Sequence, residues 1–93
     1  MGTIRLTHLE GVLIMKKIKR QLELLHIELN KQLVSRERVA EIKDHTLEIA
    51  SMLDSELDTN VLRSMVNEIY KRESKYLKRQ VKKSVKLLID YVS

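Results

Sequence analysis

Hydrophobic side chains recur at helical spacing along the first third of the chain. They are three or four residues apart, which places them on one face of a helix over residues 7–32. Thr7 and Glu10 fit a capping box at its start. Leu24 and Ile27 widen the stripe, so we expect this helix to meet more than one neighbour. The stripe itself is Met15, Ile18, Leu22, Leu25, Leu29 and Leu33.

Two further stretches show the same periodicity, separated by short polar breaks. Ser35 is the expected N-cap of a helix over residues 36–57, and Asp58 or Thr59 is the expected cap of a helix over residues 60–91. The second stripe is Val39, Ile42, Thr46, Ile49 and Leu53. The third stripe is Val66, Tyr70, Ser74, Leu77, Val81, Val85, Leu88 and Val92. Its 11-residue rhythm is that of a nearly straight helix.

These elements predict an all-α fold in a single domain over residues 1–93. Short breaks favour antiparallel neighbours, so we expect an antiparallel three-helix bundle, or a helical hairpin with a long basic C-terminal helix. The third helix projects beyond the second, and its surplus apolar stripe then needs a protein partner or a second copy. That predicted partner interface is Val66, Leu77, Val81, Val85, Leu88 and Val92. The alternative is a break near Glu73 and Ser74, which folds the chain back into four short helices.

The amino-acid composition excludes several kinds of functional site but does not identify a function. Apolar residues make up 43% of the chain and charged residues 33%, a globular composition. There are two glycines and no proline, cysteine, tryptophan or phenylalanine. Without cysteine there are no disulfides, thiolate metal sites or thiol nucleophiles. Two glycines cannot build a phosphate-binding loop or a nucleotide fingerprint. We therefore expect no enzyme, no catalytic residues, no cofactor and no small-molecule substrate.

Histidines supply the only candidate metal ligands. Glu23 and His26 have the Glu-x-x-His spacing of di-iron bundles, but those sites need a second such pair. Glu41 and His45 lie four apart and share a helix face. Both pairs are more typical of hydrogen-bonding neighbours, and we expect no metal site.

Charge is distributed unevenly along the chain, whose net charge is +5. Residues 16–20 carry four cations, residues 21–68 are acidic, and residues 69–93 carry eight cations and two acids. The predicted nucleic-acid-binding set is Lys71, Arg72, Lys75, Lys78, Arg79, Lys82, Lys83 and Lys86. A secondary set is Lys16, Lys17, Lys19 and Arg20. The row of cations in residues 71–86 is suited to non-specific contacts with phosphates. The alternative interpretation is an ordinary helix face that is exposed to solvent and binds nothing.

The sequence favours a small, non-enzymatic helical interaction protein. We expect an accessory or regulatory subunit that works beside nucleic acid, docked on a replication or transcription enzyme. The alternative is a protein–protein adaptor or self-associating regulator without nucleic-acid contact. A third interpretation is an amphipathic helix on a membrane surface, which the absence of tryptophan and phenylalanine disfavours. The longest apolar run is Val12–Met15, so we expect no membrane span and a cytoplasmic location.

Overall fold

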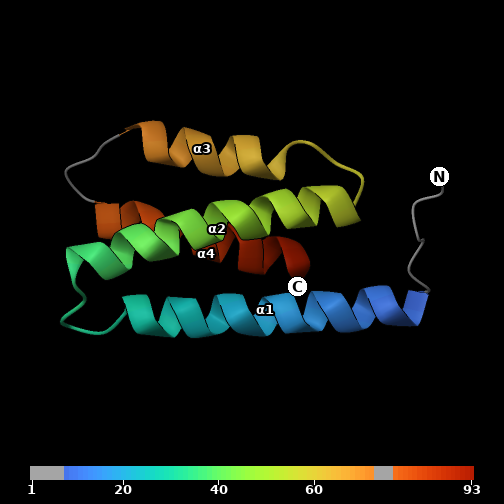
Figure 1. The fold of residues 1–93 in the computed structure, drawn as a ribbon, viewed down its shortest axis with the longest axis horizontal. Coiled ribbons are helices and arrows are strands. Elements are labelled where there is room, and N and C mark those ends of the chain that lie inside the picture. The colour runs from blue at the N-terminus through green and yellow to red at the C-terminus, as the bar shows by residue number, and fades with distance from the viewer. Residues whose placement is uncertain (1–7, 73–76) are drawn as a thin grey trace.

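The computed structural model describes residues 8–72 and 77–93, and these residues form four helices. Figure 1 shows α1 and α2 running antiparallel, with α3 on the opposite side of α2 from α1. Helix α4 packs against each of the other three, whereas α1 and α3 do not touch. The helices are α1 (His8–Leu29), α2 (Arg36–Glu56), α3 (Leu62–Arg72) and α4 (Leu77–Val92).

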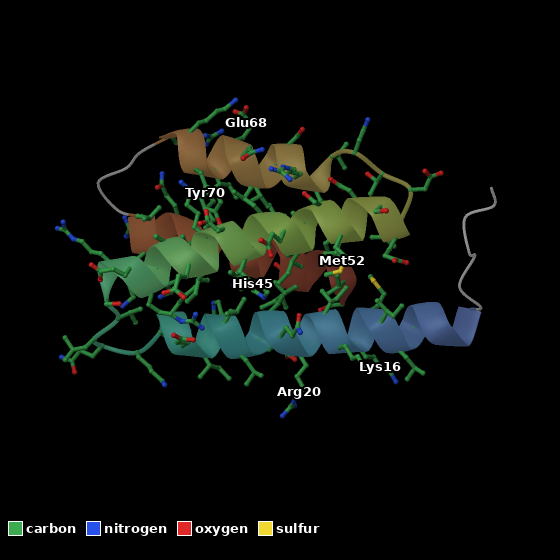
Figure 2. The ribbon with its side chains drawn as sticks, in the orientation of Figure 1. Lys16, Arg20, His45, Met52, Glu68 and Tyr70 are labelled. Atoms are coloured by element: carbon green, nitrogen blue, oxygen red, sulfur yellow. The ribbon has the colours of Figure 1, made fainter. Side chains whose placement is uncertain are left out.

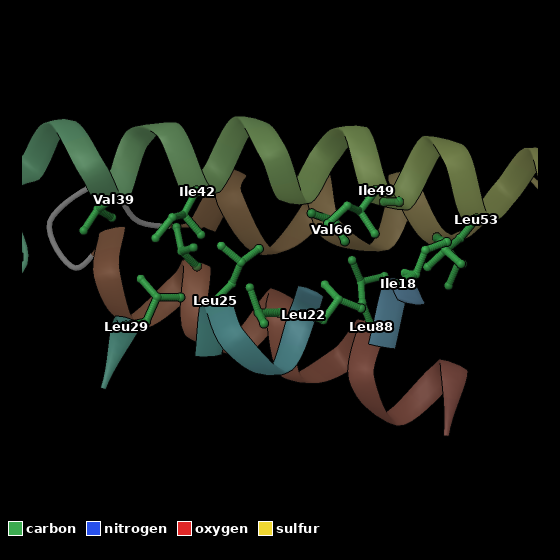
Figure 3. Packing of buried hydrophobic residues seen from close by; sticks show 14 residues of the cluster. Ile18, Leu22, Leu25, Leu29, Val39, Ile42, Ile49, Leu53, Val66 and Leu88 are labelled. Carbon is green, nitrogen blue, oxygen red and sulfur yellow. The ribbon is translucent and has the colours of Figure 1, made fainter. Parts of the chain in front are cut away.

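One hydrophobic core holds the four helices together. All five residues of the stripe predicted for the second helix are buried, including the polar Thr46, whose hydroxyl donates to the Ile42 carbonyl at 2.7 Å. From α1 the core takes Ile18, Leu22, Leu25 and Leu29, as predicted. Figure 3 shows these side chains and those of α2 pointing toward one another. Leucine and β-branched side chains at three- and four-residue spacing are thus sufficient to build this core.

The first helix is shorter than predicted and ends at Leu29 instead of residue 32. The Asn30 N–H donates to the carbonyls of both His26 and Ile27, and the Lys31 N–H donates to the Glu28 carbonyl. These tighter bonds close the last turn and stop the helix. Leu33, predicted to extend the stripe, is therefore 92% exposed. The predicted capping box rests on Thr7 and the Glu10 side chain, which lie outside the described part of the chain.

Helix α2 begins where the sequence predicts, because Ser35 is its N-cap. The Ser35 hydroxyl accepts a hydrogen bond from the Arg38 N–H at 3.1 Å, which satisfies one of the free donors of the first turn.

The turn between α2 and α3 corrects the predicted capping residues. Asp58 adopts a left-handed conformation (φ 52°), and the Thr59 N–H donates to the Asp54 carbonyl at 2.9 Å. This arrangement closes the C-terminus of α2. The Thr59 hydroxyl accepts from the Val61 N–H at 3.3 Å, just before α3, while the Asp54 carboxylate accepts from the N–H groups of Leu62 and Arg63 at 2.9 and 3.0 Å. One side chain on α2 therefore fixes the start of α3.

The predicted single helix over residues 60–91 is wrong, because α3 ends at Arg72 and α4 packs back against it. The Tyr70 hydroxyl lies 2.6 Å from the Ser84 hydroxyl. Fourteen residues of continuous helix would separate these two positions by about 21 Å along the axis. The Gln80 side-chain amide also donates to the Ile69 carbonyl at 3.2 Å. The four-helix alternative describes the structure.

This reversal places the predicted partner interface inside the chain's own core. Val66, Val81, Val85 and Leu88 are fully buried, and Leu77 and Val92 are partly buried against the core. The continuous stripe would be surplus on a projecting helix, but once the helix folds back its two halves face α2 and each other. Four of the six residues therefore have no surface left for a partner, and Leu77 and Val92 have only part of theirs.

Two leucines on α1 test the position of the core. Leu22 is fully buried and Leu24 is 54% exposed. Leu22→Ala should lower the free energy of unfolding by about 2–5 kcal/mol because it leaves a cavity. Leu24→Ala should change it by at most about 0.5 kcal/mol. Urea denaturation followed by circular dichroism measures both, and equal losses would contradict this core.

Tyr70 provides a pH-dependent test of the contact between α3 and α4. Burial raises the pKa of Tyr70 above its ordinary value of 10.0, although the Ser84 hydrogen bond acts in the opposite direction. As pH rises, the Tyr70 hydroxyl therefore loses its proton at a lower pH in the unfolded chain than in the folded chain. The contribution of Tyr70 to folding stability is complete below pH 10 and is lost as pH rises toward the folded-state pKa.

The matching variant is Tyr70→Phe, which removes both the Ser84 hydrogen bond and the titrating group. Near pH 8 it should be less stable than the parent chain by about 0.5–1.5 kcal/mol. As pH rises past about 10, the gap between the two free energies of unfolding should shrink. A gap that stays constant across this range would show that the Tyr70 hydroxyl is not buried.

Candidate nucleic-acid interface

Five cations of the predicted binding set lie on α4. At 3.6 residues per turn, they occupy an arc of about 140° around the helix axis. Arg79, Lys83 and Lys86 are exposed, while Lys78 and Lys82 are half-buried. The buried residues of α4, from Gln80 to Leu88, occupy the remaining side of the helix. The cations of α4 thus form one continuous face directed away from the core.

Contacts with the neighbouring helices orient this face. Gln80 and Ser84 bond to residues of α3, so that flank of α4 faces α3. The Lys78 ammonium donates to the Lys31 carbonyl, just beyond the end of α1, at 2.9 Å. The face formed by the five α4 cations therefore begins at Lys78, on the flank of α4 that faces α1. From there it extends around α4 toward solvent.

Helix α1 supplies the secondary set of cations beside this arc. Glu28 pairs with Arg38 of α2, so its side of α1 faces α2. Lys19 lies nine residues before Glu28, which places it about 180° around the helix, on the flank facing α4. Lys16 and Arg20 follow on the exposed side next to Lys19. Figure 2 shows Lys16 and Arg20 projecting from α1 away from α2 and α3.

Acidic residues concentrate on a different helix. Helix α2 carries six acids and three bases, while α4 carries five bases and the single acid Asp90. The ion pairs of lysine and arginine side chains among the described residues are Arg38 with Glu28 and Glu41, and Lys71 with Glu68. None of them involves a cation of α4 or of residues 16–20. Among residues 8–72 and 77–93, the cations of α4 and of residues 16–20 therefore have no acidic side chain as an ion-pair partner.

The ion pair between Arg38 and Glu28 neutralises an acid of α1, the helix that carries the secondary set of cations. Arg38 donates to both carboxylate oxygens of Glu28, at 2.6 and 2.9 Å. This hydrogen bonding holds the pKa of Glu28 below its ordinary value, so the carboxylate stays ionised and bound to α2. Glu23, which is exposed, and Asp90 are the acids left on α1 and α4 near the cations.

The chain reversal divides the predicted binding set. Lys71 and Arg72 lie at the end of α3, and Lys71 pairs with Glu68 at 3.6 Å. Lys75 lies outside the described residues. In place of one long row, the structure packs α4, with its five cations, against α1, which carries the secondary set. Lys78 lies at the C-terminal end of α1, so the α4 cations run along the second half of that helix and residues 16–20 follow further along it. Sequence periodicity could not reveal this juxtaposition, because it depends on where the chain turns back.

The histidines that are candidate metal ligands contact residues three or four positions further along the chain. His26 contacts its neighbour Asn30 at 3.2 Å. His45 lies 3.9 Å from Glu48 instead of forming a site with Glu41. Within residues 8–72 and 77–93, no three histidine, aspartate or glutamate side chains come together as a group that could hold a metal ion.

None of the four described helices has the length and apolar character needed to cross a membrane. Comparison of the chain with protein-family models, curated proteins and solved structures finds no match. The surface properties of this fold are therefore the basis for any functional conclusion.

Proposed function

We propose that this protein is a non-enzymatic accessory or regulatory subunit that works beside nucleic acid and contacts phosphates through one basic face. We define the α1–α4 basic face by the cations that these two helices carry on adjoining surfaces. It comprises Lys16, Lys19, Arg20, Lys78, Arg79, Lys82, Lys83 and Lys86. Lys17 is left out because it lies about 20° from Glu28, on the side of α1 nearer to α2. Lys71 and Arg72 are left out of it because they belong to α3.

The observation that carries this proposal is the separation of charge between helices. Like charges on α4 repel one another and weaken the helix, and Lys16, Lys19 and Arg20 add three more cations on the helix α1 that packs against it. The acids that would relieve this repulsion lie mostly on α2. A polyanion with regularly spaced charges, such as a nucleic-acid backbone, neutralises such a face and releases its own counterions on binding.

The chemistry of the basic face favours non-specific binding. It consists of flexible ammonium groups with two guanidinium groups, and the described part of it contains no aromatic side chain on which bases could stack. Contacts to phosphates position a protein on nucleic acid but carry no sequence information. We therefore expect binding to depend on strand length and salt, with little preference for sequence.

The membrane alternative has less support from the described surface. It relies on Leu87, Leu88 and Ile89 as the apolar side of a helix lying on lipid. Leu88 is fully buried, and the other two are partly buried against the core. The adaptor alternative needs an exposed apolar surface, and the residues first assigned to it are also buried. A different exposed stripe, on α1, favours that alternative.

Salt dependence tests the basic face directly. Fluorescence anisotropy with a labelled oligonucleotide should show binding that weakens steeply as salt concentration rises. Replacing Lys83 and Lys86 by glutamine should weaken binding at every salt concentration and reduce the slope of log K against log salt by about two. Absence of binding at low salt, or binding indifferent to salt, would refute the proposed function.

A matched control separates the position of the charges from their number. The double variant Arg36→Gln, Lys71→Gln removes two exposed cations from α2 and α3, so its net charge equals that of Lys83→Gln, Lys86→Gln. We expect it to retain most of the binding and the slope of the parent chain. Equal losses in the two variants would show that net charge alone, and not the α1–α4 basic face, determines binding.

A further inference from the structure

Helix α1 carries a second stripe that the core does not use. We call it the outer α1 stripe: Leu13, Lys17, Arg20, Leu24 and Ile27. The spacing alternates between four and three residues, the repeat of a coiled-coil seam. On a helical projection the stripe is centred opposite the buried Leu22. Its three apolar members, Leu13, Leu24 and Ile27, are 50%, 54% and 60% exposed.

Nothing in the described fold covers this stripe. Helix α1 contacts only α2 and α4, on its other flanks, and does not touch α3. In Figure 2, Arg20 projects from α1 away from the rest of the molecule. The leucine and isoleucine side chains of the outer α1 stripe therefore have no packing role in the core of this chain.

The shape of the stripe fits a helix better than a membrane. It spans an arc of about 80° along the described part of α1, which is the narrow width of a coiled-coil seam. Helices that lie in a lipid interface present a wide apolar face, usually with tryptophan or phenylalanine, and this chain contains neither. A partner helix would cover Leu24 and Ile27 with its own apolar seam residues.

The charges on the stripe determine which helix fits. An antiparallel second copy that sets Leu24 against Ile27 also sets Arg20 against Lys31. A parallel copy stacks Lys17 on Lys17 and Arg20 on Arg20. Both of these self-pairing arrangements thus bring like charges together, whereas a helix with carboxylates opposite Lys17 and Arg20 pairs them favourably.

We propose that the outer α1 stripe is a docking surface for an acidic amphipathic helix of another protein. Apolar seam residues of that helix would pack on Leu13, Leu24 and Ile27, and its glutamate or aspartate side chains would pair with Lys17 and Arg20. This assigns to α1 the protein contact that the buried stripe of α3 and α4 cannot make.

The proposal is tested with two synthetic helices of about three heptads, both with leucine at the seam positions. One carries glutamate at the flanking positions and opposite Lys17 and Arg20, and the other carries lysine at those positions. Titrating the full chain into each labelled peptide should give binding to the acidic helix at least about tenfold tighter than to the basic one. Equal binding to both, or no binding to the acidic helix, would overturn the proposal.

Variants of the stripe separate its apolar and charged contributions. The double variant Leu24→Gln, Ile27→Gln should weaken binding of the acidic helix by about tenfold or more. Lys17→Glu, Arg20→Glu should reverse the preference toward the basic helix. The matched control Leu57→Gln, Met65→Gln changes two exposed apolar residues elsewhere and should leave binding unchanged. An equal loss in that control would overturn the proposal.

Other occupants of the stripe are identified by the same variants. Analytical ultracentrifugation showing a dimer of the parent chain that Leu24→Gln, Ile27→Gln dissociates would make a second copy the occupant. Co-sedimentation with phosphatidylcholine vesicles containing phosphatidylserine, lost in the same variant, would make a membrane the occupant. Either result would overturn the proposal.

The result is distinguishable from that of the proposed function. Leu24→Gln, Ile27→Gln removes no charge, so it should leave oligonucleotide binding intact. Lys83→Gln, Lys86→Gln changes only α4, so it should leave binding of the acidic helix intact.

Discussion

The packing of α4 back against α3 is the constraint on which the remaining structure depends. It is maintained by the burial of Val66, Val81 and Val85 and by the Tyr70–Ser84 hydrogen bond of 2.6 Å. The Ser84 hydroxyl also donates to the Val81 carbonyl at 2.8 Å, so displacement of the two helices would leave the partly buried Tyr70 hydroxyl without its Ser84 partner. The reversal converts one long amphipathic stripe into two stripes that complete a four-helix core.

The same reversal determines the surface. If residues 60–91 formed one rod, their cations would extend into solvent as a single row. With α4 folded back, its five cations lie on a helix that packs against α1 and its cations. Most acids lie on α2, and the α1 acid Glu28 is paired with Arg38. The α1–α4 basic face and the outer α1 stripe meet on α1, where they share Arg20, but they differ in chemistry. One is cationic, and the other combines apolar side chains with cations at seam spacing.

Local features of the sequence predicted much of this architecture. The all-helical class, the Ser35 cap and every buried residue of the α2 stripe are confirmed, because spacing and capping chemistry act over a few neighbouring residues. The end of the third helix was not predictable in the same way. The stripe from Val66 to Val92 satisfies helical periodicity throughout, and the choice between a rod and a hairpin depends on contacts such as Tyr70 with Ser84 and Ile69 with Gln80. The capping of α3 by Asp54 was missed for a similar reason, since it reaches across a turn.

The most direct test of this account is the distance between the start of α3 and the end of α4. The chain contains no native cysteine, so Ser64→Cys and Asp90→Cys, both at exposed positions, allow selective spin labelling. The antiparallel register of Tyr70 and Ser84 places these two positions beside each other, and double electron–electron resonance should give a distance of roughly 10–25 Å between the labels. A distance near 39 Å, the length of the corresponding continuous helix, would contradict the chain reversal and with it the adjoining cations of α1 and α4.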